Sequence, residues 1–597
     1  MPKVFLKFIL LISCTVFSQN LPLANSFFKN GEYKKALIEY NKILKKEPFR
    51  TECFLKKIKC HQELKQYKIA HKELTKKIKT NQFKSVYFVE LGYNYSLQKD
   101  IDNATKAFKK AINLVQKKPS EASSVGKRFE NYNLLSEAEN TYLKALAVNE
   151  RANFDYQLAK IYGQQNKIEK MFEFYLKIIE KSRQNENIIQ NIISKFLNDD
   201  SKNKNNILFK KTILKNMQNG PNPLWNEQLS WLFIQEKQFN KAFTQEKALY
   251  KRENYNLNRI YDLGIITNKQ KDYETAMNIF SFIENKSIDQ KIQINVALIL
   301  IEMKEINISK KDYNLIKEEY QLALNNFGIN NKTINIQLSY AKFLAFKKKE
   351  IELAINFLNK NKNNNLTKFN KARLEMALAD ILVANNKFNQ ALINYTKVER
   401  AIKNNPLGQE AIFKIAKTSY YKGDFDWALQ QLSVLKKSTS QLIANDALNL
   451  HLLIKDHNKS DSLNIALKKY SKADHLAFKN KNIEALKLLD SILNNHPTDK
   501  IIDDTLFFQA KLYELENNNL SAKENYLRII NNLKESIFVD DALFNLAKLE
   551  LNLFNNTENA SIYLERIIFN HADSIHFIEA KNMYRKLRGD NIESSSL

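Results

Sequence analysis

The sequence is poor in the residues that interrupt helices. Its 597 residues include only 10 glycines and 8 prolines, far below average usage. Hydrophobic residues make up 44% of the chain, which is enough to bury a long core. A compact fold of this length would ordinarily split into several domains, whereas a solenoid of repeated helices need not. The sequence therefore predicts a chain dominated by helices.

Arginine is also scarce. Of the 93 basic residues 81 are lysine and 12 are arginine, and with 65 acidic residues the net charge is +28. Surfaces that read nucleic-acid sequence or bind phosphate favour arginine for its planar guanidinium group. The lysines are instead scattered among asparagines, as in 202–206 and 361–365, which indicates a solvated surface. We therefore expect no nucleic-acid partner.

The N-terminal segment has the features of an export signal. Lys3 and Lys7 precede a short apolar core, and 16–18 form a cleavage site that ends in a small residue. We expect a signal peptide at 1–18 that is cleaved between Ser18 and Gln19. No later stretch is apolar and long enough to span a bilayer. The expected location is the periplasm or the outer-membrane periphery of a bacterium.

A lipoprotein is the alternative interpretation of the same segment. Residues 11–14 resemble a lipobox, which would place a lipid anchor on Cys14. The apolar core before Cys14 is unusually brief, however, and apolar residues continue to Phe17. These two features favour cleavage after Ser18.

The clearest motif lies between residues 85 and 118. Apolar residues recur at helical spacing on both sides of a polar turn: Phe88, Leu91, Gly92 and Tyr95, then Ala104, Phe108 and Ala111. The pattern predicts two amphipathic helices that Gly92 and Ala104 allow to approach closely. Its spacing resembles the tetratricopeptide repeat (TPR), a helix-turn-helix unit of about 34 residues. The resemblance implies an all-α, right-handed TPR α-solenoid that acts as an interaction scaffold.

Similar but unequal repeats continue along the chain. We expect an N-terminal TPR array of five repeats at 19–199, a divergent helical segment at 200–370, and a C-terminal TPR array with a capping helix at 371–597. Within 285–365, Ala341 and Ala354 are one residue farther apart than the repeat requires, which predicts altered turns. An extra helix is expected near 440–454.

The C-terminal third has a second resemblance. Its units begin with acidic stretches, as in 503–508 and 540–544. Residues 406–588 look like the periplasmic repeat proteins that serve outer-membrane β-barrel assembly, or those that coordinate the Tol–Pal system with wall synthesis. Paired carboxylates at helix starts also interact favourably with the helix dipole, which is a sufficient structural reason for them.

Signatures of catalysis are not found. The sequence has no phosphate-binding glycine loop, nucleophile elbow or two-histidine metal motif, so we expect no enzyme activity, no cofactor and no metal. Cys53, Cys60 and His61 are the nearest approach to a cluster. Their spacing along a helix places the two sulfurs roughly 10 Å apart, beyond disulfide reach. We interpret them as packing residues.

The inner face of the superhelix is the expected binding surface, because first helices line it in this class of repeat. Candidate groove residues, chosen by position, are Val89, Tyr93, Tyr156, Lys160, Phe413, Lys417, Tyr420 and Phe507. Aromatic and lysine side chains suit a peptide segment with apolar or acidic anchors. About half of these residues could instead pack between repeats.

The sequence thus predicts an exported scaffold or adaptor that binds other proteins in the bacterial cell envelope. One alternative is an assembly factor for outer-membrane β-barrels or the cell wall. Another is a binder of anionic envelope polymers through its lysine-rich surface.

Overall fold

The chain folds into helices throughout the part that the structure describes. The structure is a computed structural model that describes residues 20–589, apart from 81–83, 150, 253–255, 310–311, 363–364, 404, 436–440 and 459–463. Every regular element in these residues is helical, and the predicted all-α solenoid class is confirmed. The predicted signal peptide, its cleavage site at Ser18 and Gln19, and Cys14 lie outside the described residues.

Two compact units make up the chain. Unit 1 ends at Ile279 and unit 2 begins at Phe280, so the division falls within α17 (Tyr273–Lys286). This point lies inside the segment 200–370, and the three-part organisation given above stays a prediction. None of the helices in the described residues is both long and apolar enough to cross a membrane.

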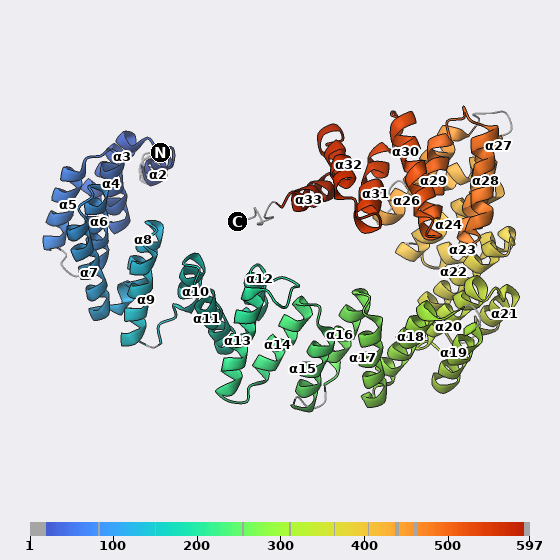
Figure 1. Cartoon of the computed structure of the whole chain (residues 1–597), viewed down its shortest axis with the longest axis horizontal. Coiled ribbons are helices and arrows are strands. Elements are labelled where there is room, and N and C mark those ends of the chain that lie inside the picture. Colours follow the sequence, from blue (N-terminus) through green and yellow to red (C-terminus); the bar gives the residue numbers. More distant parts are fainter. Residues whose placement is uncertain are drawn as a thin grey trace, which may run out of the picture. The chain divides into compact units, whose positions relative to one another are not determined.

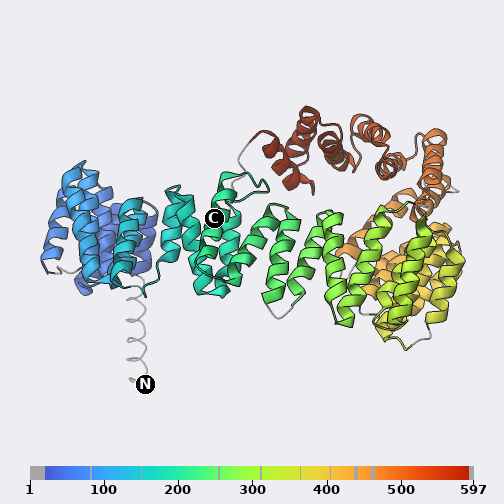
Figure 2. The same ribbon diagram turned by 60° about the horizontal axis from the view of Figure 1, so that its bottom comes forward.

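Unit 1 is a row of antiparallel helix pairs that stand side by side (Figures 1 and 2). Its helices before α17 are α2 (Asn20–Lys29), α3 (Tyr33–Lys46), α4 (Thr51–Glu63), α5 (Tyr67–Thr80), α6 (Ser85–Leu97), α7 (Ile101–Lys117), η1 (Pro119–Glu121), α8 (Ala122–Asn131), α9 (Leu135–Val148), α10 (Asp155–Gln164), α11 (Ile168–Lys181), η2 (Arg183–Asn185), α12 (Glu186–Ser194), α13 (Lys204–Gln218), α14 (Pro223–Gln235), α15 (Phe239–Arg252) and α16 (Asn258–Lys269).

The tight turns of unit 1 are built almost without glycine. In seven turns within helix pairs one residue has a positive φ, and apart from Gly31 it is lysine or asparagine with φ between 55° and 64°: Lys65, Lys99, Asn133, Asn166, Lys237 and Lys271. Asparagine tolerates this left-handed conformation, whereas lysine adopts it at a cost. From Gly31 to Asn166 these residues recur every 33 or 34 positions. The array therefore has the spacing that the motif at 85–118 predicted.

Glycine is required where the helices of a pair touch. A Cβ atom on Gly126 of α8 would lie 2.2 Å from Cζ of Tyr142 in α9, and one on Gly92 of α6 would lie 2.4 Å from Cε1 of Phe108 in α7. No side chain fits at such distances. The predicted role of Gly92 in close helix packing is confirmed.

Unit 2 contains the remaining helices, which also form antiparallel pairs (Figure 1). After α17 they are α18 (Gln290–Asn307), α19 (Tyr313–Phe327), α20 (Ile334–Lys342), η4 (Phe343–Lys347), α21 (Ile351–Asn361), α22 (Lys368–Ala384), α23 (Phe388–Ala401), α24 (Pro406–Lys422), α25 (Phe425–Val434), α26 (Gln441–His457), α27 (Ile465–Phe478), α28 (Asn482–Asn495), α29 (Ile502–Leu515), α30 (Asn519–Asn532), α31 (Val539–Asn552), α32 (Thr557–Asn570) and α33 (Phe577–Leu587).

The repeats of unit 2 are longer than those of unit 1. The positive-φ turn residues Lys349, Asn386 and Gly423 are 37 positions apart, and Asn480, Asn517 and Asn555 follow one another at 37 and 38. The wider gap from Gly423 to Asn480 contains α26, the extra helix that the sequence predicted near 440–454.

The altered turn predicted in the middle segment is a π-helical turn. It is formed by η4 (Phe343–Lys347) between α20 and α21. A π turn accommodates one additional residue in a helix. Ala341 and Ala354 are both fully buried on either side of it, so the extra residue between them is absorbed without moving either alanine to the surface.

The final helix packs against the last pair of unit 2. Ala580 of α33 is fully buried, and Tyr584 and Leu587 pack against the last hydrophobic cluster. This satisfies the requirement that the open end of a repeat array be closed.

Candidate functional site

First helices of successive pairs in unit 1 share one surface, which we call the first-helix face. Its centre is a stack of Tyr93 from α6 on Tyr132, the residue that follows α8. Their ring centroids are 3.6 Å apart with an interplanar angle of 7°. Nζ of Lys59 in α4 lies 4.7 Å from the centroid of Tyr93 and 5.2 Å from that of Tyr132. Three consecutive pairs therefore contribute to one aromatic platform, with an ammonium group beside the two stacked rings.

A buried carboxylate holds this platform in place. Glu90 of α6 is fully buried and accepts hydrogen bonds from the Tyr132 hydroxyl at 2.8 and 3.0 Å. Nε of Arg128 lies 2.9 Å from the same carboxylate. Burial raises the pKa of Glu90, and Arg128 and the Tyr132 hydroxyl act in the opposite direction. Because the ring of Tyr132 is fixed by its hydroxyl, the stack with Tyr93 is preorganised.

Two further predicted residues extend the face along α10. Tyr156 is 49% exposed, and its ring lies edge-on to Tyr175 at 6.3 Å. The Lys160 side chain is 53% exposed and lies 3.5 Å from Glu130. Tyr156 and Lys160 are one helical turn apart, so they project from the same side of the helix. Both are accessible to a partner.

Val89 does not belong to this surface, which corrects the prediction. It is fully buried, because α6 is in contact with α4, α5, α7 and α8. A helix surrounded on four sides exposes only a narrow strip, and Tyr93 occupies that strip whereas Val89 lies in the core.

Tyr420 of unit 2 is also wrongly predicted as a groove residue. It is fully buried in α24, which is in contact with α23, α25, α26 and α27. The Tyr420 ring lies 5.7 Å from Tyr421 and 6.0 Å from Phe425. The inserted helix α26 is thus one of the elements that surround α24.

Phe413 and Lys417 of the same helix line a cavity of about 340 Å³. The cavity lies among α22, α23, α24 and α27, and its lining contains two ion pairs. Nζ of Lys414 lies 2.8 Å from Asp380, and Nζ of Lys417 lies 3.4 Å from Asp474. The charged groups therefore neutralise one another across the cavity.

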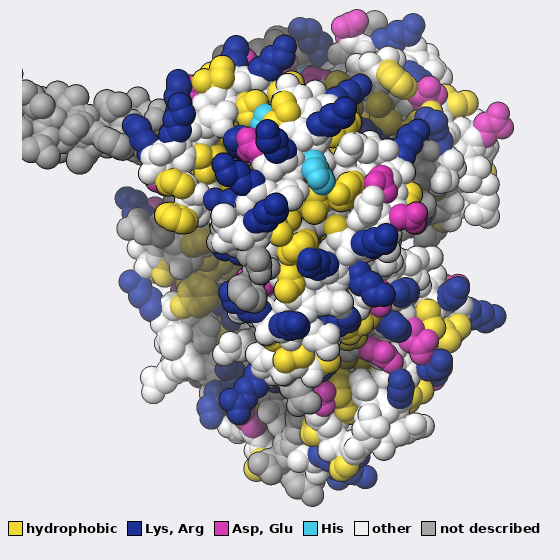
Figure 3. Space-filling view, turned by 90° about the vertical axis from the view of Figure 1, so that its left-hand side faces the viewer, with side chains coloured by type: hydrophobic (Ala, Val, Ile, Leu, Met, Phe, Trp, Pro, Cys, Tyr) yellow, Lys and Arg dark blue, Asp and Glu magenta, His cyan; other side chains and the backbone are white. Residues whose placement is uncertain are grey.

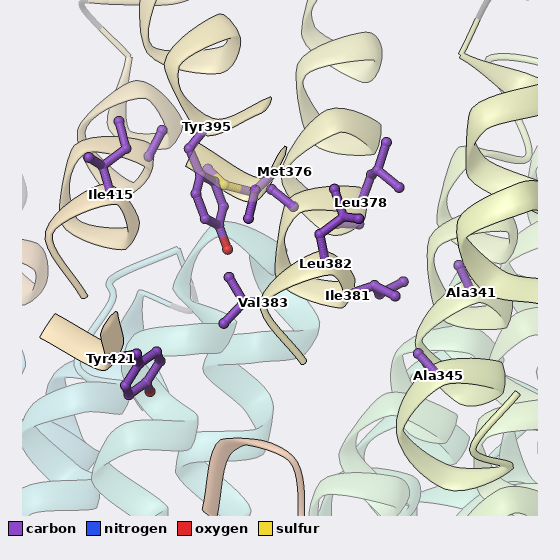
Figure 4. Packing of buried hydrophobic residues seen from close by; sticks show 14 of the residues in the cluster. Ala341, Ala345, Met376, Leu378, Ile381, Leu382, Val383, Tyr395, Ile415 and Tyr421 are labelled. Atoms are coloured by element: carbon purple, nitrogen blue, oxygen red, sulfur yellow. The ribbon is translucent and has the colours of Figure 1, made fainter. Parts of the chain in front are cut away.

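Helix α27 closes this region, a feature that sequence reasoning missed. Nε2 of His475 lies 2.9 Å from the carbonyl oxygen of Val383 in α22, and the ring of Phe478 lies 6.1 Å from Tyr421. Figure 4 shows Tyr395 of α23 and Tyr421 of α24 around Val383. His475 and Val383 are 92 positions apart, and no repeat pattern indicates that they meet.

The remaining predicted residue, Phe507, is half-buried in α29. Its ring stacks on Phe538 with centroids 4.7 Å apart and an angle of 14°. Because Phe538 immediately precedes α31, this contact joins successive pairs. Phe507 thus packs between repeats, while one part of its surface reaches solvent.

The two cysteines that the structure describes are packing residues. Cys53 and Cys60 are buried free thiols of α4, and burial raises the pKa of Cys60 to about 12. A thiol of that pKa is not a nucleophile near neutrality. Among the residues that the structure describes, no group of three or more His, Cys, Asp or Glu side chains is placed to hold a metal ion.

No protein-family model matches the chain, and no curated protein matches it in sequence. Solved structures that align with it include "Structure of Naa15/Naa10 bound to HypK-THB" at 14% identity, covering 96% of this chain and 91% of that one with a TM-score of 0.26. The P58(IPK) TPR domain aligns at 13% identity over 62% and 99%, with a TM-score of 0.18. The APC/C hetero-tetramer Cut9–Hcn1 aligns at 12% over 96% and 98%, with a TM-score of 0.22. None of these alignments carries an inference about what the present chain binds.

Proposed function

We propose that the protein is a non-catalytic scaffold that binds segments of other proteins on the first-helix face of unit 1. The observation that supports this most directly is the stack of Tyr93 on Tyr132, which the buried Glu90 fixes from below. Rigid aromatic side chains supply contact area at a low entropic cost, and they are enriched in protein interfaces.

The chemistry of the face favours a segment with an apolar or aromatic anchor followed by a carboxylate. The anchor would pack on the Tyr93–Tyr132 platform beside Lys59, and the carboxylate would pair with Lys160. Lys160 is only weakly engaged by Glu130, at 3.5 Å, so an incoming acid can compete for it.

Crosslinking in cells tests this proposal. A photoreactive residue at Tyr156 should capture a partner protein, and one at Ile38 serves as the control. Ile38 is 56% exposed and lies on α3, the second helix of its pair. Capture at Tyr156 should fall when Tyr93→Ala is added, because the platform is lost. Equal capture from Ile38 contradicts the proposal. Capture from Tyr156 that is unchanged by Tyr93→Ala also contradicts it.

The proposed location is the bacterial cell envelope, on the grounds of residues 1–18. Fractionation and mass spectrometry of the mature N-terminus test it. A chain beginning at Gln19 indicates a soluble exported protein, and a lipid on Cys14 indicates an anchored one. A chain that keeps Lys3 and Lys7 in the cytoplasmic fraction contradicts export. A role in β-barrel or wall assembly, the more specific form of the proposal, requires co-purification with outer-membrane components after gentle crosslinking.

Binding of an anionic envelope polymer is the second candidate, and the charge of unit 1 favours it. Residues 1–279 contain 49 Lys and Arg against 28 Asp and Glu, whereas residues 280–597 contain 44 against 37. Affinity for such a polymer should fall steeply with salt. A flat salt response would exclude this candidate and leave the protein-binding proposal unaffected.

A further inference from the structure

A second surface of unit 1 has a different chemistry from the first-helix face. It is a groove of about 880 Å³ between α3 and α5, with α4 as its floor. Lys57 of α4 lies in the groove, whereas Lys59 of α4 lies over the aromatic platform. Two positions along a helix correspond to about 200° of rotation. The groove and the platform therefore lie on opposite sides of α4.

Apolar residues form the bottom of this groove. Leu44, Pro48 and Phe54 contribute to it, and Ile69 of α5 is 46% exposed along its wall. Nζ of Lys77 donates a hydrogen bond of 2.9 Å to the carbonyl oxygen of Pro48, which links the two sides at one end. This hydrogen bond bounds the groove at that end.

The lining of the groove includes five lysines and a single acidic residue, Glu73. Nζ of Lys57 lies 2.6 Å from the carboxylate of Glu73, so this ion pair neutralises the acidic residue. Lys68, Lys72 and Lys76 have no ion-pair partner among the described residues, and all three are exposed. They follow one another at every fourth position of α5, where like charges repel one another. This ridge of three ammonium groups lacks a counter-charge within the described part of unit 1.

We propose that this groove, which we call the α3–α5 groove, binds an acidic amphipathic helix of a partner protein. Its apolar face would contact Ile69, Leu44 and Phe54, and carboxylates at every fourth position would pair with Lys68, Lys72 and Lys76. The match follows from geometry, because two α-helices lying side by side have the same pitch. Figure 3, which faces this end of unit 1, shows Lys and Arg side chains spread around a band of hydrophobic ones.

A synthetic probe tests the inference on the full chain. The probe is a fluorescein-labelled helical peptide of about five turns, with leucine on one face and glutamate on the other. A second peptide keeps every glutamate but replaces leucine with serine, and a third replaces glutamate with lysine. Fluorescence anisotropy at fixed salt should show binding of the first peptide alone, because the groove supplies both an apolar floor and positive charge.

Variants of the protein locate the binding. Lys72→Glu combined with Lys76→Glu should weaken the affinity for the Leu/Glu peptide by about tenfold or more, since it turns two attractions into repulsions. Ile69→Ser should weaken it by roughly threefold through lost apolar contact. The matched control is Lys109→Glu with Lys117→Glu on α7, two exposed lysines in a depression where Leu114 is the one apolar lining residue. This control should change the affinity by less than about twofold.

The outcomes separate the possibilities. Equal binding of the serine peptide would show a general polyanion surface and would overturn the inference, as would an equal effect of the α7 control. All substituted side chains are exposed, so the variants should unfold at the same temperature as the parent. Tyr93→Ala should leave peptide binding unchanged. Failure of this inference can therefore be told apart from failure of the proposed function.

Discussion

The two units are made of the same kind of helix pair, yet the first helices of the pairs are exposed to different degrees. In unit 1 the first helices expose Tyr156 and Lys160 beside a preorganised pair of tyrosines. In unit 2 the corresponding helices α22 and α24 are covered by α27, and Tyr420 is core. The change coincides with one inserted helix, α26. A position that faces a groove in a regular array becomes interior when an insertion redirects the next pair.

Charge and repeat length follow the same division. Most of the excess positive charge is in unit 1, and its turns recur every 33 or 34 positions, against 37 or 38 in unit 2. Inside unit 2, lysines near the cavity are paired with Asp380 and Asp474. Unit 1 thus has the larger excess of positive charge and exposed aromatic and lysine side chains. In unit 2 the corresponding side chains are buried or paired.

The largest expected effect concerns whether the units are stable independently. Gly126→Val forces a branched side chain into the ring of Tyr142 and should destabilise unit 1 by about 3 kcal/mol. Hydrogen exchange measured by mass spectrometry should show lost protection before Ile279 and little change after Phe280. Ser123→Val, at an exposed site on the same helix, is the control and should stay within about 0.5 kcal/mol. Equal loss of protection in both units would refute the comparison.

A smaller effect is expected from two substitutions that compare the covered first helices of unit 2 with the exposed first-helix face of unit 1. Phe478→Ala removes a ring that packs near Phe346 and Tyr421, and should cost about 2 kcal/mol. Tyr156→Ala removes a half-exposed ring and should cost less than about 1 kcal/mol. Urea unfolding of each variant gives both values. Similar costs would mean that the two faces do not differ in packing.

Most of the fold could be predicted from sequence because it depends on local spacing. Gly92 and Phe108 belong to one helix pair, so the motif that contains them also specifies their contact. The one-residue excess between Ala341 and Ala354 signalled the turn that the structure shows as η4. The positions of the lysines and asparagines with positive φ could also be predicted from sequence, because they recur at the repeat period.

The accessible residues were harder to predict. Tyr93 and Val89 lie on one helix, and only the packing of four neighbours decides which of them reaches solvent. Tyr420 is buried on a helix that contacts α26 and α27. The hydrogen bond between His475 and Val383 spans 92 positions. Periodicity identifies which residues belong to a repeat, but not how an irregular insertion places the next one.

A pH dependence should distinguish the buried carboxylate of unit 1 from an exposed one of unit 2. Burial raises the pKa of Glu90 in the folded state. The contribution of Glu90 to the free energy of unfolding is therefore fully present below its unfolded-state pKa of about 4.3. That contribution is lost as the pH rises through the folded-state pKa. Stability relative to Glu90→Gln should therefore fall with rising pH. Unfolding in urea between pH 4 and 7, followed by Trp225 and Trp231 in a Trp427→Phe background, measures it.

Glu352 of unit 2 supplies the opposite sign. A hydrogen bond from Lys387, with a second from Asn385, lowers its pKa, so its contribution is present above the unfolded pKa and lost as pH falls. Stability relative to Glu352→Gln should rise with pH, although the exposed site makes the change small. Urea unfolding followed by Trp427, the tryptophan of unit 2, in a Trp225→Phe and Trp231→Phe background measures it. Slopes of the same sign for the two comparisons would contradict the raised folded-state pKa of Glu90.

The smallest expected effect concerns the turns, where unit 1 uses lysine more often than unit 2. Lys99 has φ of 63° and Asn517 has φ of 58°, and both are exposed. The left-handed conformation costs a non-glycine residue about 1 kcal/mol or more. Glycine removes this cost, but it also raises the conformational entropy of the unfolded chain, which offsets part of the stabilisation. Lys99→Gly should therefore stabilise unit 1 by about 0.5 kcal/mol. Asn517→Gly should be close to neutral, because asparagine already tolerates this conformation. Lys109→Gly, inside α7, is the control and should destabilise by about 1 kcal/mol. If Lys99→Gly destabilises as the control does, the lysine turns are not strained, and the scarcity of glycine has no energetic cost in unit 1.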